Sequence, residues 1–430
     1  MLTISVGAEL AFVPQDVLKA MERIGRAGFR VWLVGGAVRD HLLGLEPRDW
    51  DLVTNAASSD IMSIFPSVVP VGIRHGTVQV HTRCRDMEVT SFSGDSGIVE
   101  DLGRRDFTIN SLAISYPEGV LLDPNRGRED LGAGLIRAVG EARARFSEDP
   151  LRIVRAARIC GVYGFEIEPE TFEAMKMDGD KLGSVSGERV RDEILKILVS
   201  ANVPTAFGQL KECGALAHLI PEVEASASRQ VRKGGAETFF DHTLCSILHC
   251  PRTIRTRLAA LFHHSMILAG QADWRPGSAD IAAKTMKGWN MSKRLINEVH
   301  TLIGHQLGEE AFGWRDARIR GFITEVGAEL LDDFLALGEA EALCGGWREP
   351  GAKEQMERLG ARIKNQLGLI SAFSVRELAL GGNDLTRILG ISPGPEVGKM
   401  LKELFELVLE EPSLNTREAL IRTVEAIYGK

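Results

Sequence analysis

The stretch "VWLVGGAVRDHLLGLEPRDWDLVT", residues 31–54, decides the fold of the first part of the chain. Its pattern predicts a buried strand that ends in Gly-Gly, a short amphipathic helix that stops at Gly44, and a second strand. Runs rich in Val, Ile and Thr predict further strands at 77–82 and 86–92, and helical spacing predicts a helix over 16–27. The chain is therefore expected to begin as a mixed α/β domain.

The glycine pair of this stretch is a candidate phosphate site. Glycine leaves room beside the free backbone N–H groups and the positive end of the following helix, where a triphosphate can bind. The pair fits neither the P-loop pattern nor G-x-G-x-x-G, and a plain tight turn is the alternative. We interpret Gly35 and Gly36 as the phosphate site, and Arg39, one turn into the helix, as a side chain that reaches the same phosphates.

Two aspartates on the second strand form a candidate metal site. Asp49 and Asp51 are two residues apart, so a strand points both carboxylates to one face. Two like charges side by side need a cation, and Mg²⁺ is the ion that carboxylates and substrate phosphates hold together. Glu88 is a tentative third ligand, with Asp86 as its rival, because one residue of register decides which face each takes. A turn Asp followed by a surface Asp, and a plain exposed strand acid, are the alternatives.

Composition and charge exclude several classes of protein. With 430 residues, 44% hydrophobic, the chain is long enough for several globular domains, and its net charge of −8 gives no support to nucleic-acid binding by the whole molecule. Arginines gather between residues 104 and 233, however, where they either form a phosphate-binding stripe or pair with neighbouring acids. The six cysteines are scattered without a C-x-x-C pair, so we expect reduced thiols in a cytoplasmic protein and no zinc ribbon. No apolar run has the length of a membrane span, and the N-terminus has no signal-peptide pattern.

Beyond Phe146 the pattern changes to apolar residues three and four positions apart, with almost no alternation of period two. The rest of the chain is therefore predicted to be all helical, with breaks at the prolines near positions 221, 276, 350 and 393.

One of these expected helices, "SEDPLRIVRAARI", carries charged residues at a regular interval. Asp149, Arg152, Arg155 and Arg158 step by three and so lie near one face. An Asp acceptor beside an Arg fork can read the edge of a base, whereas ion pairs within the helix are the structural alternative.

Four ordered motifs resemble those of class II tRNA nucleotidyltransferases, the CCA-adding enzymes: "LVGGAVRDHLLG…RDWDLVT", "RRDFTINSLAI", "LLDPNRGREDL…LIRAVG" and "SEDPLRIVRAARI". The C-terminal stretch that begins "GNDLTRILG" resembles the tail of the same family, which shares ancestry with bacterial poly(A) polymerases. The resemblance implies an α+β fold, with a nucleotidyltransferase head of the polymerase-β type followed by all-α neck, body and tail. The boundaries expected for head, neck, body and tRNA-binding tail are 1–145, 146–210, 211–345 and 346–430.

The resemblance also implies a role for each matching residue. Asp49 and Asp51 would be catalytic and hold two Mg²⁺ ions, and Gly36 and Arg39 would hold the triphosphate. The ribose and phosphates would be held by Arg105, Asp106 and Asn110, and the base would be recognised by Asp149 and Arg152, with Arg155 and Arg158 close by. The expected substrates are CTP, ATP and tRNA, and the expected reaction releases pyrophosphate.

The chain departs from the family pattern at two places. The segment "DHTLCSILHC…LFHHSMIL" resembles an HD-type metal domain of related chains, but His264 stands where Asp is usual. We therefore expect His242 and His263 to be packed or solvent-facing remnants that hold no hydrolytic metal pair. The segment between Phe92 and Leu102 is short, and Ser93 stands where complete CCA-adding relatives begin a longer flexible segment with Arg.

The short segment favours an enzyme that adds only two cytidines and leaves the terminal A to a separate enzyme. Complete CCA addition and addition of A alone are the alternatives. A poly(A) polymerase is disfavoured by the acidic charge and by the lack of a basic C-terminal extension, and a phosphohydrolase by His264. A non-catalytic RNA-binding protein fits poorly with the intact Asp49 and Asp51.

Overall fold

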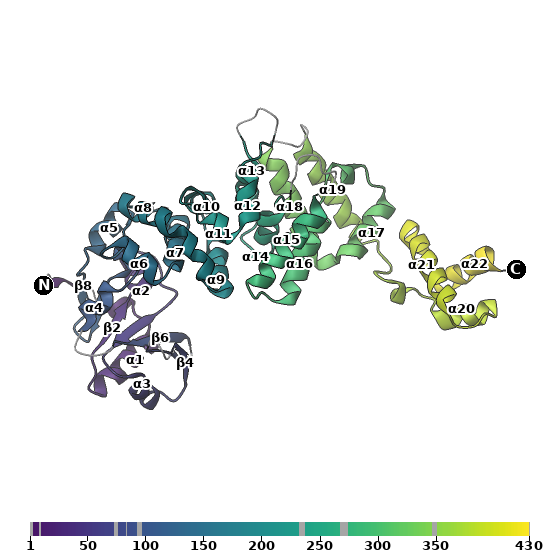
Figure 1. The fold of residues 1–430 in the computed structure, drawn as a ribbon. Coiled ribbons are helices and arrows are strands. Elements are labelled where there is room, and N and C mark those ends of the chain that lie inside the picture. Colours follow the sequence, from purple (N-terminus) through teal and green to yellow (C-terminus); the bar gives the residue numbers. More distant parts are fainter. Residues whose placement is uncertain are drawn as a thin grey trace. The chain divides into compact units, whose positions relative to one another are not determined.

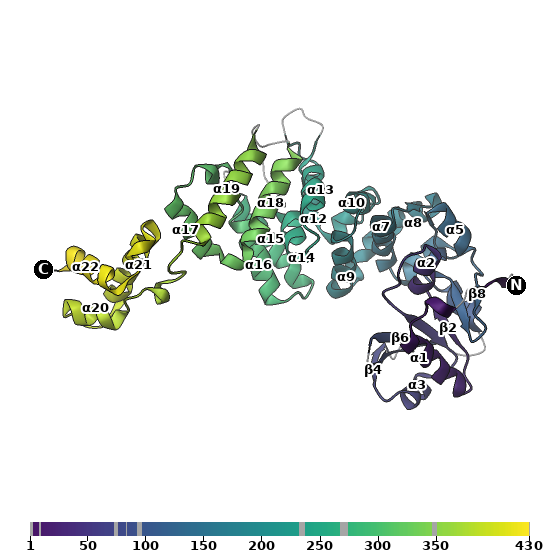
Figure 2. The ribbon, with the colours of Figure 1, turned by 180° about the vertical axis from the view of Figure 1, so that it is seen from behind.

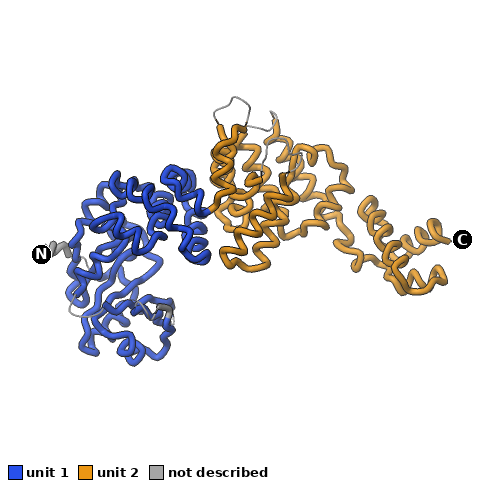
Figure 3. Tube along the Cα trace, viewed as in Figure 1, with its two compact units in different colours: residues 1–219 blue, residues 220–430 orange. Residues whose placement is uncertain are grey.

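A computed structural model describes residues 3–7, 10–72, 76–82, 84–92, 97–231, 237–266, 274–345 and 351–429. The chain divides into two compact units, here called unit 1 (residues 1–219) and unit 2 (residues 220–430), which Figure 3 shows in different colours. We describe each unit by itself.

An eight-stranded mixed sheet forms the N-terminal part of unit 1 (Figure 1). Its strand order is β1-β8-β7-β2-β3-β6-β5-β4, and every neighbouring pair is antiparallel except β3 and β6. The strands are β1 (Thr3–Gly7), β2 (Val31–Val34), β3 (Asp51–Thr54), β4 (Val68–Gly72), β5 (Thr77–His81), β6 (Asp86–Ser91), β7 (Ala113–Tyr116) and β8 (Val120–Leu122).

The predicted strands at 77–82 and 86–92 are confirmed, but the two edge strands were not predicted. Pro70 in β4 lacks the N–H that a central strand needs, and an edge strand tolerates it. An edge strand therefore gives a weaker sequence signal than β2 or β3, whose side chains are almost all buried.

The two faces of the sheet are covered differently. Side chains such as Leu33 and Leu52 pack against α1 (Gln15–Arg26), α2 (Gly36–Leu42) and α3 (Ser58–Ile64). The alternate side chains, such as Val34 and Val53, pack with Leu102 of α4 (Gly97–Gly103) on the other face. Because residues two apart on a strand share a face, Asp51 lies on the same face as Val53.

The remainder of unit 1 is helical apart from a two-stranded parallel pair, β9 (Leu135–Ile136) with β10 (Glu166–Ile167). The strand β10 contradicts the prediction that everything beyond Phe146 is helical; two residues are too few to show a period. The helices are η4 (Thr108–Asn110), α5 (Gly127–Ala133), α6 (Ala142–Glu148), α7 (Leu151–Tyr163), α8 (Pro169–Asp178), α9 (Gly187–Leu198), α10 (Val203–Glu212) and α11 (Leu216–Leu219).

The described residues of unit 2 form helices and turns, as the periodicity predicts, and Figure 2 shows them from the opposite side. Residues 372–424 bury their own apolar core, which includes Leu385, Leu404 and Leu420. The α-helices are α12 (Pro221–Ser226), α13 (Phe239–His249), α14 (Ile254–Phe262), α15 (Arg275–Gly288), α16 (Lys293–Gly304), α17 (Asp316–Val326), α18 (Leu331–Cys344), α19 (Ala352–Leu367), α20 (Gly382–Leu389), α21 (Pro395–Glu410) and α22 (Arg417–Tyr428).

The cysteines differ from the expectation of reduced thiols at one place. Cys245 on α13 and Cys344 on α18 form a disulfide with a Cα–Cα distance of 5.8 Å. The two residues are 99 positions apart, and only the packing of α13 against α18 brings them together, which the spacing of cysteines along the chain could not reveal.

Candidate active site

Gly35 forms the turn between β2 and α2, and the turn needs glycine for two reasons. Its φ is +68°, a conformation that residues with a side chain rarely adopt. A Cβ atom at this position would lie 2.7 Å from Nη1 of Arg105 and 3.8 Å from Oδ2 of Asp51. The backbone of the turn thus lies directly against the guanidinium of Arg105 and close to the carboxylate of Asp51. The helix α2 begins at the next residue, Gly36.

The carboxylates of β3 and β6 meet across the one parallel strand pair of the sheet. Asp51 is the register partner of Glu88. Burial, followed by the negative charge of Glu88, raises the pKa of Asp51 to about 6; Asp49 adds to this shift, while Arg105 and Arg155 oppose it. Asp49 and Glu88 are exposed and Asp51 is half-buried, so the group lies at the surface of the sheet with Asp51 as its least exposed member. The three carboxylates predicted from the sequence therefore do come together.

Asp86 is distinguished from Glu88 by its place along the strand. The register of β6 could not decide between the two, because residues two apart on β6 share a face. Asp86 pairs in register with His81 on β5, and its Oδ1 lies 2.6 Å from Nδ1 of that histidine. It is therefore engaged away from Asp51.

Asp106 is a buried carboxylate held by two hydrogen bonds and an ion pair. Its Oδ1 accepts hydrogen bonds from the Phe107 N–H at 2.8 Å and from Asn110 Nδ2 at 3.0 Å, and its Oδ2 lies 2.9 Å from Nη2 of Arg155. Burial by itself would raise the pKa of Asp106, but Arg155 and these donors outweigh it and hold the pKa below its ordinary value. Asp106 is thus ionised and fixed in place, and it ties the loop before η4 to α7.

Arg39 lies inside a network of protein groups. It donates to Oδ1 of Asn110 at 2.5 Å and to Oδ1 of Asp40 at 2.8 Å, and its guanidinium lies 4.5 Å from the centre of the Tyr163 ring. The Tyr163 hydroxyl donates to Asp40 at 2.8 Å. Burial, ahead of the neighbouring charges, raises the pKa of Tyr163 to about 12. Arg39 therefore links α2 to α7, a role that the sequence did not reveal.

The motif "LLDPNRGREDL" supports the segment that carries Asn110. Asp130 accepts a hydrogen bond from the Thr108 hydroxyl at 2.7 Å. A Cβ atom at Gly127 would lie 2.1 Å from the carbonyl oxygen of Thr108, so α5 lies directly against η4. This motif thus acts by positioning the residues of the site.

The residues expected to read the base do not share one helix. Asp149 lies between α6 and α7, with extended backbone angles, and α7 begins only at Leu151. Arg189 on α9 donates to both carboxylate oxygens of Asp149, at 3.1 and 2.7 Å. Arg152 donates to Glu148 at 3.2 Å and to the carbonyl of Arg104 at 2.9 Å. The prediction of a continuous helix through these positions was therefore wrong, because Pro150 follows Asp149 and disfavours a helical conformation there.

The two remaining arginines of α7 pair with residues on other elements. Nη2 of Arg155 contacts Asp106, as described above, and Nε of Arg158 lies 2.5 Å from Oε2 of Glu193 on α9. The alternative of ion pairs within α7 is thus not what the structure shows. The partners Arg189 and Tyr163 were missed; Arg189 lies in the arginine-rich run "ERVRDEILK", whereas Tyr163 gave no local signal.

The short segment after β6 is described only in part. Residues 93–96, which include Ser93, lie outside the described residues, and Gly97–Gly103 form α4. Leu102 of that helix is buried against the sheet.

A second group of polar side chains lies in unit 2. His242, His263 and His264 are buried together with Glu341 of α18, and these four residues are here called the His–Glu cluster. Of the two environments expected for His242 and His263, packed or solvent-facing, the structure has the packed one, and a carboxylate is present as well. It comes from a helix far along the chain and not from the position that follows His263.

Profiles of three protein families match the chain in order. They are the "Poly A polymerase head domain" over residues 31–137, the "Probable RNA and SrmB- binding site of polymerase A" over 164–226, and a domain 2 of tRNA nucleotidyltransferases over 277–424. Within the part of the chain that the structure describes, no helix is long and apolar enough to cross a membrane.

Two relatives are similar over almost the whole chain. The CCA-adding enzyme of Limosilactobacillus fermentum is 30% identical over 420 residues, 94% of each chain, and that of Lactococcus lactis is 30% identical over 439 residues, covering 97% of this chain and 99% of the relative.

Solved structures agree in fold. The Bacillus stearothermophilus CCA-adding enzyme in complex with CTP matches with a TM-score of 0.75 and 27% identity, over 96% of each chain. The Thermotoga maritima CCA-adding enzyme complexed with tRNA matches over 97% of each chain with a TM-score of 0.59 and 21% identity. The α+β fold expected from the sequence is confirmed.

Proposed function

The chain belongs to the family of CCA-adding enzymes, and from this premise we propose that it adds CMP and AMP from CTP and ATP to the 3′ end of tRNA, completing CCA. One observation carries the proposal for this chain. A glycine turn, a set of carboxylates and an arginine meet at one end of β2, β3 and β6, where Gly35, Asp51 and Arg105 lie within contact distance. Such a site holds a cation and a triphosphate side by side.

The carboxylates fit Mg²⁺. Their donor atoms are all oxygens, the ligands that this hard cation prefers. Burial, followed by the negative charge of Glu88, raises the pKa of Asp51, and a bound cation would favour its ionised form. We propose that Asp49 and Asp51 hold the ion, with Glu88 as the third ligand. When bound, Mg²⁺ would activate the attacking hydroxyl and neutralise the charge on the phosphates.

The chain's own residues position the nucleotide. The guanidinium of Arg105 lies beside the glycine turn and Asp51, where the phosphates would lie. The Gly35 N–H donates to the carbonyl of Leu112 at 3.1 Å, so Gly35 serves by leaving room, and the start of α2 at Gly36 would offer its N–H groups to the phosphates. Asp106 and Asn110 would hold the ribose, and Asn110 is itself oriented by Arg39. Because the transfer needs little covalent chemistry from the protein, positioning and charge neutralisation account for the catalysis.

Base recognition is assigned to the junction of α6 and α7. Asp149 offers carboxylate oxygens and Arg152 a guanidinium, and both are held by side chains or carbonyls from other elements. A fixed acceptor and a fixed donor fork can match the Watson–Crick edge of C or A and mismatch that of U or G. Arg155 and Arg158 would act indirectly: they would not contact the base but would hold α7 in place through their ion pairs with Asp106 and Glu193.

Addition of two cytidines only is the second candidate function, favoured by the nine residues between Phe92 and Leu102. A change of pocket from C to A needs a mobile lever, and α4 takes up much of this segment. The relatives support complete CCA addition better, because each is named for that activity. We assign residues 1–145, 146–210, 211–345 and 346–430 to head, neck, body and tRNA-binding tail.

The test is incorporation into a tRNA that ends at the discriminator base, with each nucleoside triphosphate alone and in mixture. We expect CTP alone to give two additions, CTP with ATP to give three, and UTP and GTP to give none. A product that stops after two cytidines with abundant ATP would establish the second candidate, and its extension by an A-adding enzyme would check that the product is intact. No Mg²⁺-dependent incorporation with any nucleotide would overturn the proposal.

A further inference from the structure

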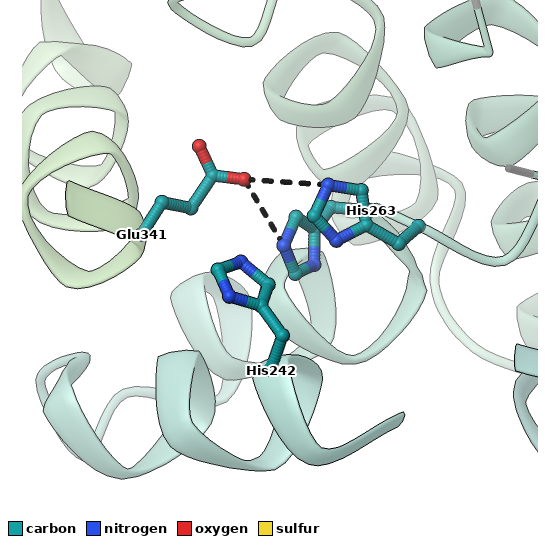
Figure 4. A group of neighbouring side chains, drawn as sticks. His242, His263 and Glu341 are labelled. Carbon is teal, nitrogen blue, oxygen red and sulfur yellow. Dashed lines mark ion pairs between the residues drawn. The ribbon is translucent and has the colours of Figure 1, made fainter. Parts of the chain in front are cut away.

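The His–Glu cluster gathers four metal-ligating side chains in the interior of unit 2. One ligand atom from each of His242, His263, His264 and Glu341 lies within 4.8 Å of the other three. All four side chains are buried, with at most 1% of each residue exposed. Figure 4 shows His242 on its helix and His263 and Glu341 facing one another, with the carboxylate oxygen directed at the histidines.

The contacts of His263 indicate which of its two ring nitrogens carries the proton and which carries a lone pair directed at the carboxylate of Glu341. Nδ1 lies 2.6 Å from the carbonyl oxygen of Ala260, and a carbonyl can only accept, so Nδ1 carries a proton. In a neutral ring Nε2 then bears a lone pair, and it lies 3.0 Å from Oε1 of Glu341, which is also an acceptor when ionised. Two acceptors at this distance need a proton or a cation between them.

The other side chains favour a cation. Nε2 of His264 approaches the same oxygen at 3.8 Å, so two imidazoles converge on one carboxylate oxygen where a single proton satisfies only one contact. In tetrahedral zinc sites with ligand bonds of about 2.0–2.1 Å, neighbouring donor atoms lie about 3.4 Å apart, between the two distances seen here. The Ala260 carbonyl accepts from the far nitrogen of His263, and the Gln306 amide donates to Oε1 of Glu341, the oxygen that also faces the histidines. Hydrogen bonds of this kind from outside the ligand set orient metal ligands.

We propose that the His–Glu cluster binds one divalent transition-metal ion, for which Zn²⁺ is the best match, with three imidazoles and one carboxylate as ligands. Imidazole with carboxylate suits this class of ion, and a buried carboxylate is compensated by the charge of the ion. The inference concerns unit 2 alone and does not rest on the proposed nucleotidyl transfer.

The ion would be structural. Four protein ligands complete a tetrahedral shell, whereas a hydrolytic zinc site keeps one position for water or substrate. The ligands come from α13, from the residues after α14, and from α18, so one ion would tie three helical segments together. We therefore expect no metal-dependent hydrolysis of nucleotides or 2′,3′-cyclic phosphates by this unit.

A neighbouring group must be separated from the cluster in any test. Cys245, His249 and Cys344 also bring three ligand atoms within 4.8 Å of one another, on the same helices α13 and α18. When the disulfide is reduced, these thiols can take a metal of their own. The double variant Cys245→Ser/Cys344→Ser is therefore the matched control, because it removes that group and leaves the His–Glu cluster unchanged.

The first experiment measures the metal content of the untagged full-length chain after dialysis against metal-free buffer, using mass spectrometry of the dissolved metals. We expect about one zinc per chain in the wild type and in the Cys245→Ser/Cys344→Ser variant, and less than about a tenth of that in Glu341→Gln and His264→Ala. The proposal would be overturned if Glu341→Gln kept its zinc and the Cys245→Ser/Cys344→Ser variant lost it. A wild-type chain that carries no zinc and takes up none would do the same.

A second experiment uses only wild-type protein, in case the variants do not fold. Stripped by a chelator, the chain should unfold at a temperature lower by about 5 °C or more, and Zn²⁺ at about a hundredfold excess over Kd should restore it. Cobalt in place of zinc should give the visible bands of a tetrahedral ion without the near-ultraviolet band of a cobalt–thiolate bond. A thiolate band, or no thermal response to either ion, would contradict the assignment.

Discussion

The carboxylate site of unit 1 and the His–Glu cluster of unit 2 both gather ionisable side chains, but the carboxylates differ in their exposure to solvent and in the groups that face them. In unit 1, Asp49 and Glu88 are exposed and Asp51 is half-buried, with Arg105 and Arg155 near enough to oppose the rise of its pKa. In unit 2, the carboxylate of Glu341 is fully buried and faces imidazoles.

The difference in ligand type and exposure separates the two proposed metal sites in kind. Oxygen ligands at the surface of a sheet bind a hard cation weakly and leave room for substrate phosphates, as a catalytic site requires. Imidazoles enclosed between helices bind a transition metal tightly and leave no room for substrate. The comparison therefore predicts different losses when a carboxylate is replaced: loss of nucleotide addition at the site of unit 1, and loss of the bound ion and of stability at the cluster of unit 2.

The largest expected effect is that of Asp51→Asn on transfer. Nucleotide addition should fall by about 10³-fold or more, because several kcal/mol of charge stabilisation is lost, while tRNA binding and the zinc content of unit 2 stay as in the wild type. The measurements are incorporation of labelled CMP, tRNA binding and metal analysis. Asp86→Asn is the control, since Asp86 lies on the same strand but pairs with His81. Substantial incorporation by Asp51→Asn would remove the metal role of this residue.

Gly35→Ala should reduce addition by about 10²-fold, because the new Cβ would lie 2.7 Å from Arg105 and would displace the guanidinium from the phosphate side of the site. Gly44→Ala is the matched control: its φ of +70° is nearly the same as the +68° of Gly35, and a Cβ there meets nothing within 4 Å. Both variants should lose about 1 kcal/mol of stability from backbone strain. The measurement is the steady-state rate of nucleotide addition. Equal rates for Gly35→Ala and Gly44→Ala would show that the close approach of Gly35 to Arg105 does not matter for catalysis.

Arg152→Ala should weaken the choice of base by about tenfold while CTP binding changes less, because a guanidinium fork reads an edge and other groups hold the phosphates. The ratio of kcat/KM for CTP to that for UTP measures this. Arg143→Ala serves as control, since Arg143 pairs with Asp178 on another helix. A variant that keeps the full wild-type ratio would contradict the role in base recognition.

The smallest expected effect concerns pH. Asp51 has a pKa of about 6 in the folded chain, above its ordinary value, so the folded state binds this proton more tightly than the unfolded state does. Ionisation of Asp51 thus destabilises the folded chain as pH rises towards about 6, and a bound cation offsets the loss. Because proton and metal compete, the affinity for Mn²⁺ as a probe should fall by about fourfold from about pH 7 to about pH 5.5. Electron paramagnetic resonance of free Mn²⁺ measures this, and an affinity independent of pH in this range would contradict the titration of Asp51.

Local patterns in the sequence were sufficient for the first strand and the glycine turn, whereas Asp49, predicted to lie on one strand with Asp51, precedes β3, which begins at Asp51. The first strand and the turn depend on the period of one element or on the conformation of one residue, and both are set by near neighbours. The edge strand β4 and the two-residue β10 were missed because a proline or a short length removes that period.

Only the tertiary structure decided which distant side chains meet. The register of β6 against β3 places Glu88 opposite Asp51; Arg189 reaches Asp149 from 40 residues away; and Glu341 joins the histidines from α18. Such contacts depend on how helices and strands pack, and packing follows from the whole apolar pattern rather than from the polar residues themselves. The sequence by itself therefore determined the elements and their polar faces, and the packing of those elements determined the partners.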